Sequence, residues 1–234
     1  MGTTYLIKVV ASDNDYKAES IKKSIDSLLI ELNKQMSTWD PESEISKFNG
    51  WNSKVPFAVS DDFLNVVKKS ITISRNTGGL FDPTVFDLMS LWGFGPNPRS
   101  GFPNIEDVHR ALEHTGIGQI EVTDSVLVKS NKMCKLDLNA IAKGYGVDKI
   151  FELLNQRGFN NIFVEIGGEV KCFGKNIKNK SWSIGIEDPN DDGNYQKNIS
   201  AIISVANGAI ATSGNYRNIV DLDGEILGHT INPQ

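Results

Sequence analysis

The sequence lacks the features of a membrane-spanning or nucleic-acid-binding chain. No run of 18 apolar residues occurs among its 234 residues, whereas a helix needs about 20 such residues to cross a bilayer. No lysine and arginine run occurs either, and the net charge is −5, so a basic surface for nucleic acid is not expected. No signal peptide is recognisable at its start.

Cysteine and histidine are also scarce. Cys134 and Cys172 are the two cysteines, without CxxC spacing or flanking histidines, which excludes a zinc ribbon and a thioredoxin-like motif. We interpret them as small buried side chains. Of the three histidines, His109 and His114 fall on a charged helix and carry no further signal. His229, in His-Thr-Ile-Asn-Pro, is a candidate general base by residue type.

The composition that remains is that of a globular protein. The hydrophobic fraction is 39% and the charged fraction 23%, enough to build a sizeable core. Apolar periodicity predicts mostly helices in the first half and mostly strands in the second. This indicates an α+β fold with mixed sheets and packed helices, or a mixed α/β arrangement, but no regular alternation. We expect a single domain over residues 1–234.

The expected elements follow from hydrophobic period and from turn and cap residues. Helices are predicted over 16–37, from 60–61 onward, near 84–91, after Asn104 and over 140–156. A polar loop with Asp40-Pro41 is expected after the first helix, and residues 77–103 are expected to form an ordered loop around the short helix. Strands are predicted at 3–10, on both sides of Asp124-Ser125, and at 133–138, 160–166, 169–173, 182–187, 200–206, 217–222 and 226–231.

The most informative motif is Leu136-Asp137-Leu138-Asn139-Ala140-Ile141-Ala142-Lys143. A strand delivers the carboxylate of Asp137, Asn139 can cap the next helix, and Lys143 adds positive charge to its first turn. Because a helix N-terminus attracts anions, this motif suits a phosphate. Taken alone, the motif is better explained as a capped helix with an exposed lysine.

Three further motifs suit a flat, phosphorylated ligand. Thr77-Gly78-Gly79-Leu80-Phe81-Asp82-Pro83 pairs glycines that allow close backbone approach with aromatic faces. Ser37-Thr38-Trp39-Asp40 follows the long first helix and can present Trp39 at a pocket edge. Ala211-Thr212-Ser213-Gly214 places hydroxyl groups before a glycine, with Arg217 nearby. Each motif also has an ordinary interpretation as a packed turn.

Together and in this order, these blocks resemble those of the ApbE family. The resemblance rests on MGTTY, MSTWDPESEISKFN, GGLFDPTV, LWGFGP, LDLNAIAKGYGVD, VEIGGEV, ATSGNYRN and HTINP, and it runs from Met1 to Gln234. Members of this family are FAD:protein FMN transferases. The joint occurrence of the blocks is specific, although no single block is.

The resemblance implies a role for each matching position. Trp39 matches an aromatic that stacks on the flavin ring, Ala140 a magnesium ligand through its backbone carbonyl, and His229 a wall near the pyrophosphate, where it would act as the catalytic base. The residues implied to contact FAD are Met1, Trp39, Leu80, Phe81, Asp82, Asp137, Lys143, Thr212, Ser213 and Gly214.

The implied reaction transfers FMN from FAD to a threonine or serine hydroxyl of a target redox-complex subunit and releases AMP. Magnesium would neutralise charge on the pyrophosphate. With water as acceptor, the same site would be an FAD pyrophosphatase. A third alternative is a non-catalytic FAD-binding protein.

Two departures from the family pattern bear on these expectations. Family members usually continue beyond Asn232-Pro233-Gln234 into a segment that completes the magnesium site, so we expect the C-terminal part of the fold to be absent from this sequence. Asn232 also replaces the usual aspartate. From the resemblance alone, we expect a periplasmic location, or the outer face of the cytoplasmic membrane, through a lipid anchor outside this chain.

Overall fold

The computed structural model describes residues 2–11, 18–188, 199–215 and 218–233. Within it the chain divides into two compact units, each built from two stretches. The first unit takes residues 1–29 and 143–214, and the second takes 30–142 and 215–234. No helix among the described residues combines the length and apolarity needed to cross a membrane. Helices gather in the first half of the chain and strands in the second, and the described strands pair in small antiparallel sheets, which confirms the predicted α+β class.

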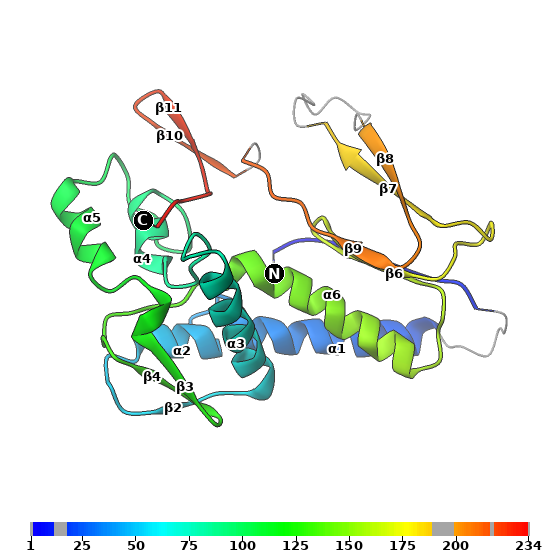
Figure 1. Cartoon of the computed structure of the whole chain (residues 1–234), viewed down its shortest axis with the longest axis horizontal. Helices are drawn as coiled ribbons and strands as arrows, with labels where there is room; N and C mark the ends of the chain where they lie inside the picture. The colour runs from blue at the N-terminus through cyan, green and yellow to red at the C-terminus, as the bar shows by residue number, and fades with distance from the viewer. Residues whose placement is uncertain (1, 12–17, 189–198, 216–217, 234) are drawn as a thin grey trace. The chain divides into compact units, whose positions relative to one another are not determined.

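The first unit is centred on a four-stranded antiparallel sheet (Figure 1). Its order is β1 (Tyr5–Val9), β5 (Ile162–Ile166), β6 (Glu169–Phe173) and β9 (Gly208–Ile210). Because strand side chains alternate between faces, Ile162, Val164 and Ile166 of β5 all point to one side. There they pack against α1 (Ala18–Met36) and α6 (Asn139–Gln156) in one apolar cluster.

The other face of this sheet packs against one part of a two-stranded ribbon. The ribbon consists of β7 (Trp182–Glu187) and β8 (Ile199–Val205). Phe163 from β5 and Cys172 from β6 pack there against Trp182 and Ile184 of β7. The Phe163 and Trp182 ring centroids lie 5.5 Å apart. β5 is therefore buried on both faces, which explains why its sequence, Ile-Phe-Val-Glu-Ile, is almost continuously apolar.

The second unit combines short helices with a three-stranded antiparallel sheet of order β2-β4-β3 (Figure 1). Its core is centred on Phe48, whose ring lies 5.5 Å from that of Phe57 and 6.4 Å from that of Phe63. Its elements are α2 (Glu44–Gly50), β2 (Phe57–Ala58), α3 (Asp61–Asn76), α4 (Phe86–Leu91), α5 (Ile105–Leu112), the 3₁₀ turn η1 (Ile117–Gln119), β3 (Ile120–Thr123), β4 (Val126–Lys129), β10 (Ile219–Leu222) and β11 (Glu225–Gly228).

Two sequence-based expectations are wrong in this unit. Part of the segment predicted as loop forms α2, since the Ser43 hydroxyl accepts the Ser46 N–H as an N-cap and Ile45 and Phe48 are fully buried. Residues 133–138 form no strand. The helix expected after Asn104 is confirmed, and the Asn104 side chain caps it by accepting the Asp107 N–H. The hairpin around Asp124-Ser125 is confirmed, with Asp124 at φ 48°.

The two cysteines are buried in separate units. Cys134 of the second unit is 0% exposed and Cys172 of the first is 2% exposed, and neither forms a disulfide. Burial raises the pKa of the Cys134 thiol to about 12 and also raises the pKa of the Cys172 thiol. Both therefore remain neutral thiols near neutral pH, which confirms their interpretation as buried apolar side chains.

Candidate functional site

In the first unit, a diglycine turn gathers several of the predicted residues. Gly167 and Gly168 both have positive φ, 56° and 99°, which suits glycine between β5 and β6. A side chain at Gly168 would stand 3.5 Å from the Thr212 hydroxyl, and one at Gly167 would clash with Thr3. The turn therefore lies against the Thr3 side chain at Gly167 and beside the Thr212 hydroxyl at Gly168.

Lys143 reaches this turn from α6. Its ammonium donates to the Gly167 carbonyl at 3.3 Å and lies 2.9 Å from a carboxylate oxygen of Glu169. The Lys143 side chain is 32% exposed, so part of it is accessible from solvent. This arrangement supplies a positive charge and a hydroxyl group around a bare backbone, which suits a phosphate group.

Glu169 lies beside Lys143 and the Gly167-Gly168 turn, and the sequence did not single it out as a site residue. One carboxylate oxygen pairs with Lys143, whereas the other is buried and has no hydrogen-bond partner among the described residues. An unpartnered buried oxygen is costly, so this position suits a hydrogen-bond donor from a ligand or a water. The position of Glu169 in the Val-Glu-Ile-Gly-Gly-Glu-Val block could have drawn attention to it. Its pairing with Lys143 could not be predicted, because it is a tertiary contact.

Ser213 and Gly214 are exposed beside Thr212. Met1, Tyr216 and Arg217 lie outside the described residues.

In the second unit, Asp137 stands at the start of α6. Its carboxylate accepts the Asn139 backbone N–H at 2.7 Å and the Asn139 side-chain amide at 3.1 Å. Asp137, not Asn139, is thus the side chain that caps the helix, which corrects the expected role of Asn139. Burial raises the pKa of the Asp137 carboxyl, opposed by the two hydrogen bonds from Asn139.

The glycines of the Gly78-Gly79 pair have a local structural role. Both have positive φ and end α3, with the Gly79 N–H donating to Ser74 O at 2.8 Å and the Gly78 N–H to Arg75 O at 3.2 Å. Their amides are therefore used by the helix end. The expectation that these amides approach a ligand is not supported by this geometry.

The following loop is held by Asp82. Its carboxylate accepts hydrogen bonds from the Thr84 N–H at 2.8 Å and the Ile117 N–H at 3.1 Å. The Asp82 carboxylate therefore fixes the loop conformation through these backbone N–H groups. Phe81 is half-buried, while Leu80 is 59% exposed. Leu80 and Phe81 are the members of this loop with apolar surface available for a ligand.

Trp39 is presented by a rigid turn. The Ser43 hydroxyl, itself the N-cap of α2, donates to the Ser37 carbonyl at 2.7 Å, and the Ser43 N–H donates to the Asp40 carbonyl at 3.1 Å. The indole between these anchors is 66% exposed. An exposed tryptophan on a fixed backbone suits stacking on a flat ring.

His229 follows β11 and packs against the Leu-Trp-Gly-Phe-Gly block. Its ring centroid lies 6.4 Å from that of Phe94, edge to face, and its Nδ1 lies 3.2 Å from the Asn218 carbonyl. Because a carbonyl only accepts hydrogen bonds, we assign the proton of the neutral ring to Nδ1. Nε2 then carries the lone pair that a general base needs.

The described residues do not supply a complete magnesium site. Ala140 is exposed on the first turn of α6 and offers one neutral carbonyl oxygen, while Asp137 is engaged with Asn139. Nowhere in the described part of the chain do three or more His, Cys, Asp or Glu side chains gather as metal ligands. A hard cation prefers about six oxygen ligands, so these residues alone do not fit the ion.

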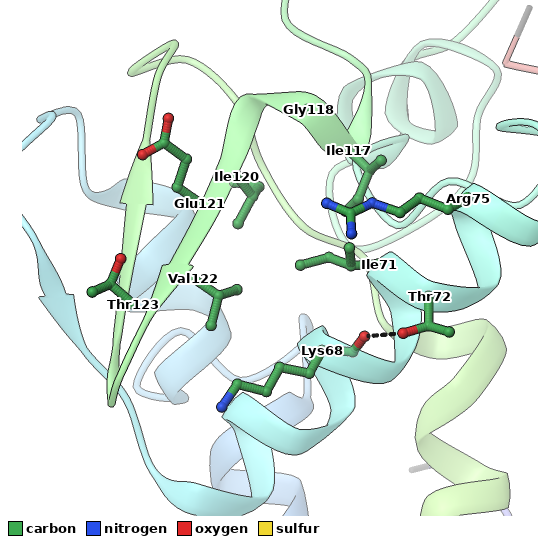
Figure 2. Close-up of a pocket in the computed structure, with 10 residues that line it drawn as sticks. All are labelled: Lys68, Ile71, Thr72, Arg75, Ile117, Gly118, Ile120, Glu121, Val122 and Thr123. Carbon is green, nitrogen blue, oxygen red and sulfur yellow. Dashed lines mark hydrogen bonds between the residues drawn. The ribbon is translucent and has the colours of Figure 1, made fainter.

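A separate pocket of about 630 Å³ lies in the second unit between α3 and the η1–β3 segment (Figure 2). Lys68 and Arg75 of α3 reach across it toward β3, and the Thr72 hydroxyl donates to the Lys68 carbonyl at 3.0 Å. None of the residues predicted to bind FAD or magnesium lines this pocket. It is therefore distinct from the candidate flavin-binding residues.

Comparison with known proteins places the chain in a family. The family model described as "ApbE family" matches residues 1–234. A Vibrio cholerae FAD:protein FMN transferase is 41% identical over 234 residues, covering 100% of this chain and 69% of that protein. A Haemophilus influenzae FAD:protein FMN transferase is 37% identical, with 100% and 69% coverage.

Solved structures agree with this assignment. The flavin transferase ApbE from Vibrio cholerae superposes with a TM-score of 0.88 at 40% identity, covering 100% of this chain and 74% of that one. The apo flavinyl transferase ApbE from Pseudomonas stutzeri gives a TM-score of 0.88 at 32% identity, with 100% and 72% coverage. The chain therefore belongs to the ApbE family and, by its kinship with these enzymes, is a transferase.

Proposed function

We propose that this protein binds FAD and transfers its FMN moiety to a hydroxyl group of a target protein, releasing AMP. The observation that carries the proposal is the group formed by Lys143, the Gly167-Gly168 turn and Thr212, which suits a phosphate. It occurs in a chain whose named relatives are FAD:protein FMN transferases. The exposed Trp39 indole supports binding of a flat ring system.

The proposed roles of the chain's own residues follow from their chemistry. Lys143 and Thr212 would hold phosphate oxygens, and Trp39 would stack on a ring of the dinucleotide. His229 Nε2 would take the proton from the attacking threonine or serine hydroxyl, which is a weak nucleophile until it is deprotonated. The new bond joins the hydroxyl oxygen to the FMN phosphorus, and the bond to the AMP phosphate breaks.

Magnesium remains part of the proposal as a requirement of the activity. A bound divalent ion would neutralise pyrophosphate charge, and Ala140 would contribute its carbonyl oxygen. Since the described residues do not complete a site, the remaining ligands would have to come from outside them. Localisation outside the cytoplasmic membrane through a lipid anchor is likewise a proposal, based on the family resemblance alone.

The function is tested by incubating the protein with FAD, magnesium and a candidate redox-complex subunit. The expected result is AMP in solution and flavin fluorescence on the subunit in a denaturing gel. AMP without covalent flavin would instead identify an FAD pyrophosphatase. Bound FAD with neither product would identify a binding protein, and omission of magnesium tests the metal requirement.

Replacing Lys143 with alanine is expected to lower FAD affinity by about ten-fold, because a charge-assisted hydrogen bond to phosphate is lost. FMN affinity should fall less and riboflavin affinity should stay unchanged, as measured by calorimetric titration of the three ligands. Lys178→Ala removes an exposed lysine of the same unit and should leave all three affinities intact. Equal losses for the three ligands would contradict a phosphate role for Lys143.

A further inference from the structure

Residues 133–138, which precede α6 and include Asp137, are held by the Asn49 side chain and not by a neighbouring strand. Leu136 donates its N–H to Asn49 Oδ1 at 2.7 Å and accepts from Asn49 Nδ2 at 2.8 Å. An amide side chain that donates and accepts in this way reproduces the pairing of a neighbouring strand. This contact explains why residues 133–138 read as a strand in sequence and yet pair with none in the described structure.

The opposite side of the same segment is fixed as well. The Asp137 N–H donates to the Pro83 carbonyl at 2.6 Å, and the Asp137 carboxylate accepts from Asn139. Backbone groups of successive extended residues point in opposite directions. The Asn49 side chain therefore holds Leu136 from one side of the segment, and the Pro83 carbonyl holds Asp137 from the other.

Asn49 is itself rigidly placed. It lies on the last turn of α2 and is 7% exposed, next to the fully buried Phe48. Its backbone carbonyl faces the Lys129 ammonium at 3.4 Å. A buried amide with both of its polar groups paired has one orientation, so it can transmit that orientation to Leu136 and Asp137.

We propose that Asn49 is a positioning residue for the flavin site. It sets the place of the Asp137 carboxylate and the first turn of α6, including Ala140, and does so without touching the ligand. The inference rests on the proposed function, in which Ala140 of this turn contributes its carbonyl oxygen, and on the contact between Asp137 and FAD that the family resemblance implies. Misplacing a binding group by about 1 Å can cost a large factor in function, which makes this contact testable.

The ligand-free protein gives the first measurement. In Asn49→Ala, amide hydrogen exchange at Leu136, Asp137 and Asn139 is expected to accelerate at least ten-fold relative to the rest of the second unit. The Leu136 N–H loses its acceptor, and the segment that keeps the Asp137 and Asn139 N–H groups against theirs loses its anchor. Asn49→Asp has the same size and keeps the acceptor for the Leu136 N–H while losing the donor. Asn49→Asp should also accelerate exchange of these amides. It replaces Asn49→Ala in the measurement if the alanine variant does not fold.

The second measurement is FAD affinity well below the unfolding midpoint of each variant. Asn49→Ala is expected to raise the Kd for FAD about ten-fold or more. The control is Val67→Ala, which removes methyl groups from a fully buried position of α3 and lowers the unfolding midpoint without changing the FAD Kd. In an Asp137→Asn background, Asn49→Ala should have a smaller effect on FAD binding, because the group it positions is already altered.

The outcomes separate the two proposals. If the unmodified protein does not bind FAD, the proposed function fails, and the exchange measurement still decides whether Asn49 fixes the segment. If it binds FAD but Asn49→Ala binds equally well, or the Val67→Ala control loses affinity to the same extent, Asn49 is merely structural. Full additivity with Asp137→Asn would also overturn the positioning role.

Discussion

Replacing Lys129 with methionine is expected to stabilise the protein at pH 7 by about 1–3 kcal/mol. The Lys129 side chain is 1% exposed, and its ammonium has only the Asn49 carbonyl at 3.4 Å and the face of the Phe48 ring at 4.6 Å as close partners among the described residues. Burial lowers the pKa of this lysine to about 8. A shift of that size corresponds to about 3 kcal/mol of destabilisation by the charged form.

The lowered pKa of Lys129 makes the free energy of unfolding depend on pH. Below pH 8 both folded and unfolded states hold the proton, so the full cost of the buried charge is present. Between about pH 8 and the ordinary lysine value of 10.5, the unfolded state binds more protons, and stability rises with pH. The advantage of Lys129→Met should therefore shrink over this interval, as followed by denaturant unfolding at a series of pH values.

Because Cys134 also titrates at high pH, the stability of Lys129→Met has to be compared with that of the unmodified protein at each pH. The raised Cys134 pKa of about 12 means that the folded state keeps a proton that the unfolded thiol loses from about pH 9, which lowers stability at high pH in both proteins. The difference between the unmodified protein and Lys129→Met removes most of this contribution. Lys54→Met, at an exposed lysine of the same unit, should show no change. A pH-independent gain in Lys129→Met would contradict the buried-charge interpretation.

Replacing Trp39 with alanine should weaken FAD binding by about 1–3 kcal/mol, on the scale of base–aromatic stacking. Because the indole is 66% exposed and the turn is held by Ser43, the free energy of unfolding should change by less than about 0.5 kcal/mol. Calorimetric titration with FAD and thermal unfolding measure the two effects.

Trp51 provides the matched control for this prediction. Its ring packs edge-on against Phe57 at 5.7 Å, and its N–H donates to Val55 O at 2.9 Å. Trp51→Ala should therefore lower stability and leave FAD affinity unchanged, the reverse of Trp39→Ala. Unaltered FAD affinity in Trp39→Ala would remove the indole from the site.

Sequence patterns predicted the elements whose apolar period is long. The helices that became α1, α3 and α6 and the β5 strand each carry several turns or alternations of buried residues, which single tertiary contacts do not override. The seven-residue α2 has only Ile45 and Phe48 as its fully buried apolar pair, too short a pattern to separate from loop. Residues 133–138 have strand composition, but the Asn49 side chain takes the place of a strand partner.

The candidate site was predictable to a different extent. Its residues lie in blocks that the family resemblance singles out, but their partners are set by tertiary structure. The pairing of Lys143 with Glu169, the hold of Asp82 on Ile117 and the grip of Asn49 on Leu136 join residues 26, 35 and 87 positions apart. No local period reports such contacts, so the sequence named candidate binding groups and missed the side chains that hold them in place.

The two buried cysteines give each unit its own reporter of opening. Cys134 belongs to the second unit and Cys172 to the first, and a thiol shielded from solvent reacts with an alkylating reagent only when its surroundings open. The labelling rate of each cysteine, followed by peptide mass, therefore measures the opening free energy of one unit at a time. Adding FAD during labelling would show which unit the ligand tightens, without any engineered probe.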